Sequence, residues 1–311
     1  MRLATLQLDS GDTVAAAAQA DGWVALPAPS LSELLRTGWS APGSGVVEGP
    51  QVAGRLVLPL PSPGKVICCG LNYGEHIAET GRDLPTHPTL FAKFADSLIG
   101  PTDDVVISGD VSADWEAELA VVVGRTLTRA SRAEAAEAIL GYTVANDVSM
   151  RDWQRRTLQW FQGKAWDATT PVGPVIVTAD EIDPTAGIAI TCRVNGVEVQ
   201  RDSTSTLVFD SAELLSYIST FTTLRAGDLV LTGTPGGIGM AREPAWFLAD
   251  GDVLETEIEA IGTLTNTVRV VEPASRARTT ASPPTPIPTP DTFWTGTTRC
   301  TPAPVDRSFP S

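Results

Sequence analysis

The stretch Trp115-Glu116-Ala117-Glu118-Leu119-Ala120-Val121-Val122-Val123-Gly124 says more about the fold than any other part of the chain. Its second half is a continuous apolar run that ends at a glycine, which is typical of a buried β-strand. Glu116 and Glu118 lie two residues apart, and successive side chains of a strand alternate between its faces. Both carboxylates are therefore expected on one face, at the edge of a buried strand.

This acidic pair has two interpretations. Carboxylates on one face repel each other unless something neutralises them, and a hard divalent cation would do so. Ligand sets made only of oxygen favour Mg²⁺, Mn²⁺ or Ca²⁺ over zinc. The alternative is that both acids lie at the end of the strand and are solvated. The Glu116–Glu118 pair alone does not distinguish between these two interpretations. Asp147, which ends the run at residues 141–147, is either a third ligand or an ordinary turn residue.

The surrounding sequence, residues 61–271, contains many short strand patterns and few helical ones. Asn195-Gly196 lies between two alternating runs and is a strong hairpin signal. Strands are expected at residues 65–70, 118–124, 141–147, 190–200, 227–233 and 253–271. Helix starts are expected at two capping patterns, Ser131 to Glu134 and Asp210 to Glu213. Because the strands do not alternate with long helices, we predict an α+β, mostly β fold with a mostly antiparallel, rolled sheet and peripheral helices.

Three segments are expected along the chain. Residues 1–60 form a small N-terminal α/β unit, with strands at residues 2–8 and 22–27 and a helix that begins after Ser30 in a capping box. Residues 61–271 form the main domain. Residues 272–311 are rich in proline, threonine and serine, and are expected to be disordered or extended because they cannot bury enough apolar area.

Composition excludes several classes of partner. The chain has 311 residues and a formal net charge of -15, so nucleic acid and anionic membranes are not expected as main partners. An anionic substrate is still compatible, since a bound cation can reverse the local field. No apolar run is long enough for a spanning helix, and Asp9 and Asp12 interrupt any signal-like region. The four cysteines lack CxxC spacing, which favours buried, reduced thiols in the cytoplasm.

Histidine is scarce, because the chain contains only His76 and His87. If the segment around His76 is helical, His76 and Glu79 share a face. A carboxylate beside an imidazole raises its basicity, which suits a general base that activates water. The spacing alone is more typical of a surface His–Glu pair on a solvated helix. His87, between prolines, favours a loop or surface position.

Two further features remain ambiguous from the residues alone. Lys164 lies among apolar and aromatic neighbours, where it either contacts an anionic substrate or extends to solvent. The glycine-rich residues 232–239 follow an expected strand, so their amides either bind an anion or form a simple turn. They match neither the P-loop nor the GxGxxG pattern, which argues against a nucleotide site.

Taken together and in this order, seven motifs resemble the fumarylacetoacetate hydrolase family. The motifs are GLNYGEHIAETG (70–81), PTLFAKFADSLIGP (88–101), WEAELAVVVG (115–124), GYTVANDVSMRDWQ (141–154), QGKAWDATTPVGP (162–174), VNGVEVQRDSTS (194–205) and GDLVLTGTPGGIG (227–239). The resemblance covers about residues 61–271 and implies a mixed β-sandwich roll, usually a homodimer, with Mg²⁺ or Mn²⁺. The site residues it implies are Glu116, Glu118 and Asp147 as metal ligands, His76 and Glu79 as a water-activating pair, and Gln154, Lys164 and Thr234 at the substrate.

One departure from the family pattern concerns the metal ligands. The longer animal-type enzymes carry a further metal-binding aspartate seven residues before the histidine, and here that position is Cys69. The chain therefore resembles the smaller branch of the family, with three carboxylates.

The activity that the resemblance implies is cleavage of a C–C bond in a small acylpyruvate-type 1,3-diketo acid. We rank this hydrolysis first because the His76–Glu79 pair is complete, and fumarylpyruvate is the single substrate that we expect first. The same enolate chemistry would serve an oxaloacetate decarboxylase or a 2-hydroxyhepta-2,4-diene-1,7-dioate isomerase. A metabolite-binding protein without activity is the third alternative, and a lost ligand would have pointed to it.

Overall fold

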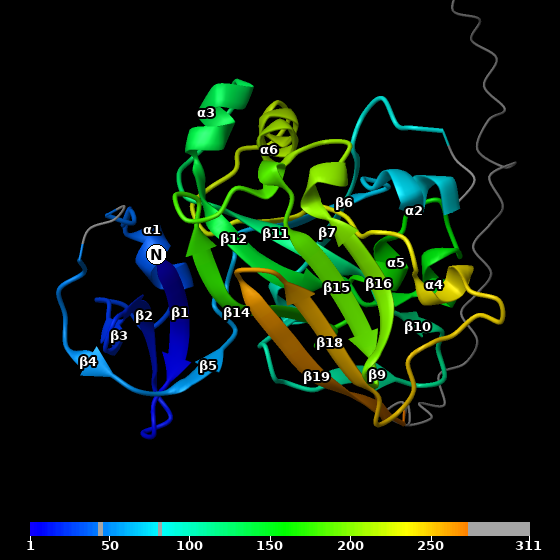
Figure 1. Ribbon diagram of the computed structural model, residues 1–311, viewed down its shortest axis with the longest axis horizontal. Coiled ribbons are helices and arrows are strands. Elements are labelled where there is room, and N and C mark those ends of the chain that lie inside the picture. The colour runs from blue at the N-terminus through cyan, green and yellow to red at the C-terminus, as the bar shows by residue number, and fades with distance from the viewer. Residues whose placement is uncertain (43–45, 80–82, 273–311) are drawn as a thin grey trace, which may run out of the picture. The chain divides into compact units, whose positions relative to one another are not determined.

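The central strand of the fold is the one that the acidic pair precedes. Figure 1 shows a computed structural model, which describes residues 1–42, 46–79 and 83–272, without the side chains of residues 75, 76 and 78. All seven residues of β11 (Ala117–Val123) are buried. It pairs antiparallel with β12 (Ile139–Asn146) on one side and with β17 (Leu229–Leu231) on the other. The continuous apolar run therefore corresponds to a strand in the middle of a sheet.

That large sheet runs in the order β4-β3-β2-β1-β14-β12-β11-β17-β6-β7, with β5 beside β1 and β8 beside β14. Most of its pairs are antiparallel, although β17 and β6 are parallel. Its remaining strands are β1 (Arg2–Gln7), β2 (Thr13–Gln19), β3 (Gly22–Ala25), β4 (Gln51–Val52), β5 (Arg55–Val57), β6 (Val66–Gly70), β7 (Thr89–Lys93), β8 (Leu98–Ile99) and β14 (Thr170–Thr178).

A second sheet packs against the middle of the first. Its order is β16-β15-β18-β19-β9, and a short β10–β13 ladder lies apart from both sheets. The strands are β9 (Val105–Ser108), β10 (Ala113–Asp114), β13 (Ser149–Met150), β15 (Ala189–Val194), β16 (Val197–Ser203), β18 (Val253–Ile258) and β19 (Gly262–Val271).

The two faces of β11 contribute to different cores. Leu119 and Val121 join a cluster with Ile190 of the second sheet. Ala120 and Val122 join a cluster that includes residues of the N-terminal segment. Burial of about 25 cal/mol per Å² of apolar area on both sides stabilises the strand in this position.

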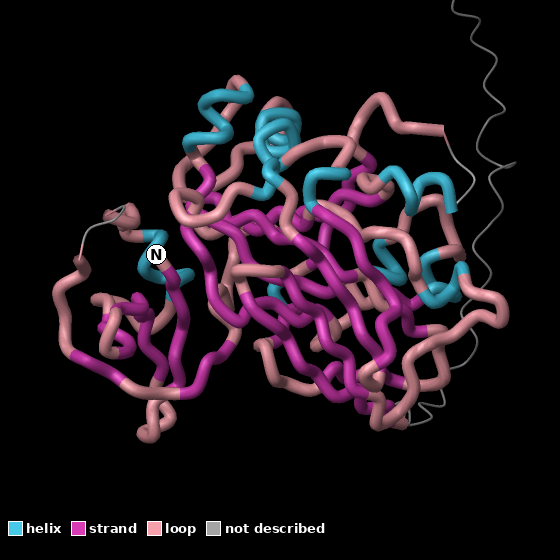
Figure 2. Tube along the Cα trace, in the orientation of Figure 1, coloured by secondary structure: helices cyan, strands magenta, loops and turns pink. Residues whose placement is uncertain are grey.

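Short helices lie around the strands, as Figure 2 shows. They are α1 (Leu31–Arg36), α2 (Gly74–Glu79), α3 (Arg132–Glu137), α4 (Arg151–Gln154), α5 (Phe161–Lys164) and α6 (Ser211–Ser219), with 3₁₀ turns at Ala95–Ser97, Pro184–Ala186, Thr204–Thr206 and Gly239–Ala241. The predicted caps are present, because Ser131 and Glu134 form a complete capping box and Asp210 accepts from the amide of Glu213. The helix that begins after Ser131 ends at Glu137, and β12 begins at Ile139.

The predicted fold class is confirmed, although several strands were not predicted, among them β2 and β4 in the N-terminal segment and β7, β9 and β14 in the main domain. The chain is mostly β, largely antiparallel, and its helices are peripheral. Sequence patterns did not predict β2, because its alanine run has weak β-propensity and the strand forms through pairing with β1 and β3.

The N-terminal segment joins the large sheet directly. Strand β1 pairs antiparallel with β14, with Arg2 opposite Val177 and Leu3 opposite Ile176. Residues Met1–Pro273 form one compact unit, so a domain boundary near residue 60 stays a prediction. The expectation for residues 272–311 falls almost wholly on residues 273–311, which lie outside the described part of the chain.

The cysteines in the described part of the chain are buried, as expected. Cys68, Cys69 and Cys192 are free and buried, and Cys300 lies outside the described residues. Among the helices of the described ranges, none is long and apolar enough to cross a membrane.

The Asn195-Gly196 turn allows a test of the hairpin. Gly196 has φ +76°, and a Cβ added there would meet nothing within 4 Å. Gly196→Ala is therefore expected to lower the free energy of unfolding by about 1 kcal/mol through backbone strain alone. Urea denaturation measures this. Gly74→Ala, in α2 and equally uncrowded, should cost less than half as much, and equal costs would contradict the explanation.

Candidate metal centre and cavity

The three predicted ligand carboxylates meet where two central strands end. Glu116 immediately precedes β11, Glu118 is its second residue, and Asp147 follows β12. The register places Ala117 opposite Asn146, and the amide of Asp147 donates to the carbonyl of Glu116 at 2.8 Å. One carboxylate oxygen from each acid lies within 4.8 Å of the others, and all three residues are buried.

Cations from three other elements neutralise part of this charge. Lys164 Nζ, at the end of α5, lies 2.7 Å from Glu116 Oε2 and 2.7 Å from Asp147 Oδ2. Lys93 Nζ, at the end of β7, lies 2.5 Å from Asp147 Oδ1. Arg151 Nη1, in α4, lies 2.7 Å from Glu116 Oε1. Lys164 is buried, so it does not extend to solvent.

Glu118 differs from its two neighbours because it has no ion pair within the described ranges. Its Oε2 accepts a hydrogen bond from Gly233 N at 2.6 Å, whereas Oε1 is buried with no partner. Burial raises the pKa of Glu118 well above its usual value, and the charges of Asp147 and Glu116 raise it further. An unpaired oxygen of this kind is costly unless a cation binds there.

The donor set fits a divalent metal. Four carboxylates, those of Asp114, Glu116, Glu118 and Asp147, face three cations, so the cluster carries a formal charge of -4 + 3 = -1. The ligands are all oxygen, which Mg²⁺, Mn²⁺ and Ca²⁺ prefer. Glu116, Glu118 and Asp147 would hold the ion, and the free oxygen of Glu118 is the observation that favours one.

Lys164 keeps its proton in this environment. Burial alone lowers the pKa of its ammonium group, but Asp147 and Glu116 outweigh burial and the net shift is upward. The side chain is therefore a fixed buried cation beside the proposed ligands, able to donate to an anionic group in the cavity.

The glycine-rich loop after β17 directs its amides at the chain's own acids. Gly233 N donates to Glu118, Gly237 N to Glu79 at 3.2 Å, and Gly239 N to Asp114 at 2.7 Å. Glycine is required at 237, because a Cβ there would lie 2.2 Å from the carbonyl oxygen of Val199. Three amides of the loop therefore bind carboxylates of the chain itself, and of these acids Glu79 lines the cavity.

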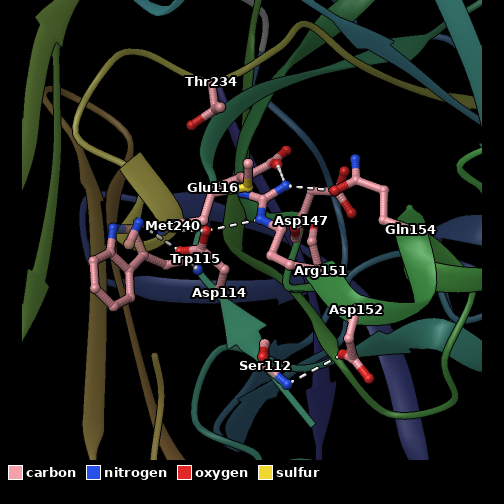
Figure 3. A network of polar contacts seen from close by, with 12 residues as sticks. Ser112, Asp114, Trp115, Glu116, Asp147, Arg151, Asp152, Gln154, Thr234 and Met240 are labelled. Atoms are coloured by element: carbon pink, nitrogen blue, oxygen red, sulfur yellow. Dashed lines mark hydrogen bonds and ion pairs between the residues drawn. The ribbon is translucent and has the colours of Figure 1, made fainter. Parts of the chain in front are cut away.

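Asp114 and Arg151 form a network that sequence reasoning missed (Figure 3). Asp114 accepts from Gly239 N at 2.7 Å and Met240 N at 3.1 Å, and its Oδ2 accepts from Arg151 Nε at 2.7 Å. Arg151 Nη1 also donates to Gln154 Oε1 at 3.0 Å, and Nη2 is buried without a partner. Asp114 therefore holds both the loop and the arginine, leaving one guanidinium nitrogen free for a ligand.

A cavity of about 870 Å³ opens over this cluster. Five of the predicted site residues line it, namely Glu79, Glu116, Gln154, Lys164 and Thr234. Glu118 and Asp147 lie behind the lining side chains and are almost fully buried. The walls include Phe91, Trp160 and Met240 along with polar residues, a mixture typical of a small-molecule site.

The structure describes the side chain of the predicted substrate-binding residue Thr234, but only part of the predicted water-activating pair. Thr234 Oγ1 accepts from Gln200 Nε2 at 2.8 Å, and Gln200 Oε1 accepts from Ala117 N, which ties Thr234 to β11. Helix α2 forms at Gly74–Glu79, as the His76–Glu79 spacing requires. The side chain of His76 lies outside the described part of the structure, so the pair stays a prediction.

His87 has the surface position in a loop that its place between prolines predicts. It is exposed in a bend before β7 and stacks on Tyr217, with 6.0 Å between ring centroids.

Comparison with known proteins gives consistent matches. The family model described as fumarylacetoacetate (FAA) hydrolase, C-terminal, matches residues 65–269. A mitochondrial oxaloacetate tautomerase of Rattus norvegicus is 42% identical over 221 residues, which are 70% of this chain and 71% of the relative. A 2,4-didehydro-3-deoxy-L-rhamnonate hydrolase of Sphingomonas sp. (strain SKA58) is 42% identical over 229 residues, 72% of this chain and 80% of the relative.

Solved structures resemble the fold over most of the chain. A fumarylacetoacetate hydrolase from psychrophilic Exiguobacterium antarcticum superposes with a TM-score of 0.77 at 34% identity, covering 87% of this chain and 100% of that one. The structural similarity thus extends over most of the chain.

Proposed function

Because the chain belongs to the fumarylacetoacetate hydrolase family, we propose that it is a metal-dependent enzyme that acts on a small anionic 2-oxo acid. The buried cluster with the unpaired oxygen of Glu118, below an open cavity, is the observation that carries this proposal. The reaction we place first is hydrolysis of a C–C bond in an acylpyruvate, with fumarylpyruvate as the first substrate to test.

The metal centre would consist of Glu116, Glu118 and Asp147. When bound there, Mg²⁺ or Mn²⁺ would supply Lewis-acid chemistry that favours the enol form of a 2-oxo acid. Lys164 Nζ and the free Arg151 Nη2 are the donors available to an anionic oxygen in the same place. Both are buried and held by carboxylates, so little reorganisation is needed when negative charge develops.

Hydrolysis also needs a base at the other end of the substrate. Glu79 lines the cavity and is held by Gly237 N, and His76 lies one helical turn before it in α2. In our proposal the His76–Glu79 pair removes a proton from water, whose oxygen bonds to the distal carbonyl carbon. The C–C bond then breaks, its electron pair stays with the 2-oxo acid fragment as an enolate, and that carbon takes up a proton.

A second candidate is keto–enol tautomerisation of oxaloacetate. The name of the 42% identical rat relative favours it, and the reaction needs only proton transfer next to the ketone. Decarboxylation of oxaloacetate and isomerisation of a hydroxydienedioate would use the same donors. A homodimer and a cytoplasmic location remain predictions from the family resemblance and the cysteine pattern.

Turnover of a small panel, with Mg²⁺ or Mn²⁺ and then with EDTA, separates these reactions. The panel consists of fumarylpyruvate, acetylpyruvate, oxaloacetate and 2-hydroxyhepta-2,4-diene-1,7-dioate. We expect cleavage of an acylpyruvate that EDTA abolishes. The absorbance of the substrate and chromatography of the products measure this cleavage. Tautomerisation or decarboxylation of oxaloacetate without acylpyruvate cleavage would replace the hydrolase proposal, and full activity in EDTA would contradict the metal.

A further inference from the structure

We propose that Arg155 binds a second carboxylate of the substrate, so that the cavity selects dicarboxylic over monocarboxylic 2-oxo acids. This inference rests on the proposed function and narrows its substrate class. It comes from Arg155, the one cavity-lining cation among the described residues that forms no ion pair with a described carboxylate.

Three cations among the residues that the structure describes line the cavity, and they differ in their partners. Lys164 is bonded to Glu116 and Asp147, and Arg151 to Asp114 and Glu116. Arg155 lines the same cavity, is exposed, and forms no ion pair with any residue that the structure describes. The deep end of the cavity thus has paired cations, and its exposed side has a free one.

The contacts that hold Arg155 in place among the described residues are not ion pairs, so they leave its positive charge unneutralised. Its backbone amide donates to the carbonyl of Arg151 at 3.3 Å, at the end of α4. Its Nη2 lies 3.6 Å from Met240 Sδ, on the loop that Asp114 holds. A thioether is a weak acceptor, so the guanidinium is directed along the wall while most of its donors stay available.

The chemistry of this group matches a carboxylate. A guanidinium offers parallel N–H donors that fit the two oxygens of a carboxylate, and the bond is charge-assisted. The nearby lining residues Thr157, Gln159 and Trp160 carry no charge. The chain has a net charge of -15, so an arginine without an ion pair at the cavity wall provides a local positive charge that can attract an anionic group of the substrate.

Arg156 is a matched control, because it is the next residue and is also exposed. Its guanidinium carbon lies 3.5 Å from the ring centroid of Trp153, and the side chain does not line the cavity. Arg155→Gln and Arg156→Gln remove the same charge from adjacent positions, and only the first change alters the cavity wall.

Isothermal titration calorimetry in the presence of Mg²⁺ tests the inference without turnover. The probes are 2-oxoglutarate and 2-oxopentanoate, which have the same chain length and differ in a terminal carboxylate or methyl group. We expect the wild type to bind the diacid about tenfold more tightly, the size of one good charge-assisted bond. Arg155→Gln should remove this preference while the affinity for 2-oxopentanoate stays the same. Arg156→Gln should keep the preference, and Arg155→Lys should keep part of it.

The possible failures are distinguishable. Equal binding of both acids by the wild type, or an unchanged preference in Arg155→Gln, would overturn the role of Arg155 and leave the proposed function standing. Binding of neither acid, with the metal shown by calorimetry to be bound, would instead contradict the proposal of a 2-oxo acid site, and the inference would fall with it.

Discussion

Replacing Glu118 by glutamine is expected to weaken the binding of Mn²⁺ by at least about 100-fold and to remove turnover with it. Glu118 is buried and its Oε1 has no hydrogen-bond partner in the described structure, so this oxygen is available to coordinate a metal ion. Glutamine keeps the size of the side chain and an oxygen for the Gly233 amide, but it removes the negative charge.

The same variant should be at least as stable as the wild type when metal is absent. The Glu118 carboxylate is desolvated and repelled by Asp147 and Glu116, and a neutral amide relieves both costs. Its nitrogen can also donate to the neighbouring acids. Calorimetry with Mn²⁺ and thermal unfolding in EDTA measure the two effects. Unchanged Mn²⁺ affinity would exclude Glu118 as a ligand.

Glu198→Gln is the control for this experiment. Glu198 is exposed on β16 and pairs with Arg201 at the surface, away from the cavity. Exposed ion pairs of this kind contribute little to stability because water and salt screen them, so metal affinity and turnover should both remain as in the wild type. A loss of Mn²⁺ binding in this variant would show that the effect is not specific to the cluster.

Lys164→Met is expected to lower the free energy of unfolding by about 3–5 kcal/mol in metal-free buffer, because it removes one partner of a buried charge network. The ammonium group contacts Glu116 and Asp147 at 2.7 Å each, and methionine has a similar length without the charge. Mg²⁺ should restore more stability to the variant than to the wild type, since a divalent cation can replace the missing positive charge.

Lys65→Met provides the comparison for Lys164. Lys65 Nζ lies 3.3 Å from Asp228 but is partly exposed, and Asp228 also accepts from the amides of Lys65 and Arg225. The cost there should stay within about 1 kcal/mol and should not depend on Mg²⁺. Urea denaturation with and without Mg²⁺ measures both variants. A Lys164→Met protein as stable as the wild type would contradict the charge network.

Local patterns predicted much of the fold because they coincide with the packing. The alternation around Asn195-Gly196 marks a real hairpin, and the apolar run after Glu118 is a strand with both faces buried. The patterns failed at β2, whose alanines are buried between β1 and β3 and carry little preference of their own. The joining of β1 to β14 spans more than 160 residues, and no local signal contains it.

The acids of the candidate site were predictable and most of their partners were not. Glu116 and Glu118 share a face because of strand periodicity, and Asp147 ends the neighbouring strand. Lys93 reaches Asp147 from 54 residues away, and this contact depends on the pairing of β7 with β6. Arg151 lies in one of the recognised motifs and Asp114 immediately precedes another, but nothing in their spacing shows that they bond to each other.

Deuterium incorporation at C3 of pyruvate and oxaloacetate in D₂O, followed by NMR, tests most directly whether this site forms the enol of a 2-oxo acid. Hydrolase, tautomerase, decarboxylase and isomerase reactions all share that step. We predict incorporation faster than the protein-free rate for at least one acid with Mg²⁺, and no acceleration with EDTA or in Glu118→Gln. An unaccelerated rate for both acids, with the metal shown by calorimetry to be bound, would contradict the proposed function.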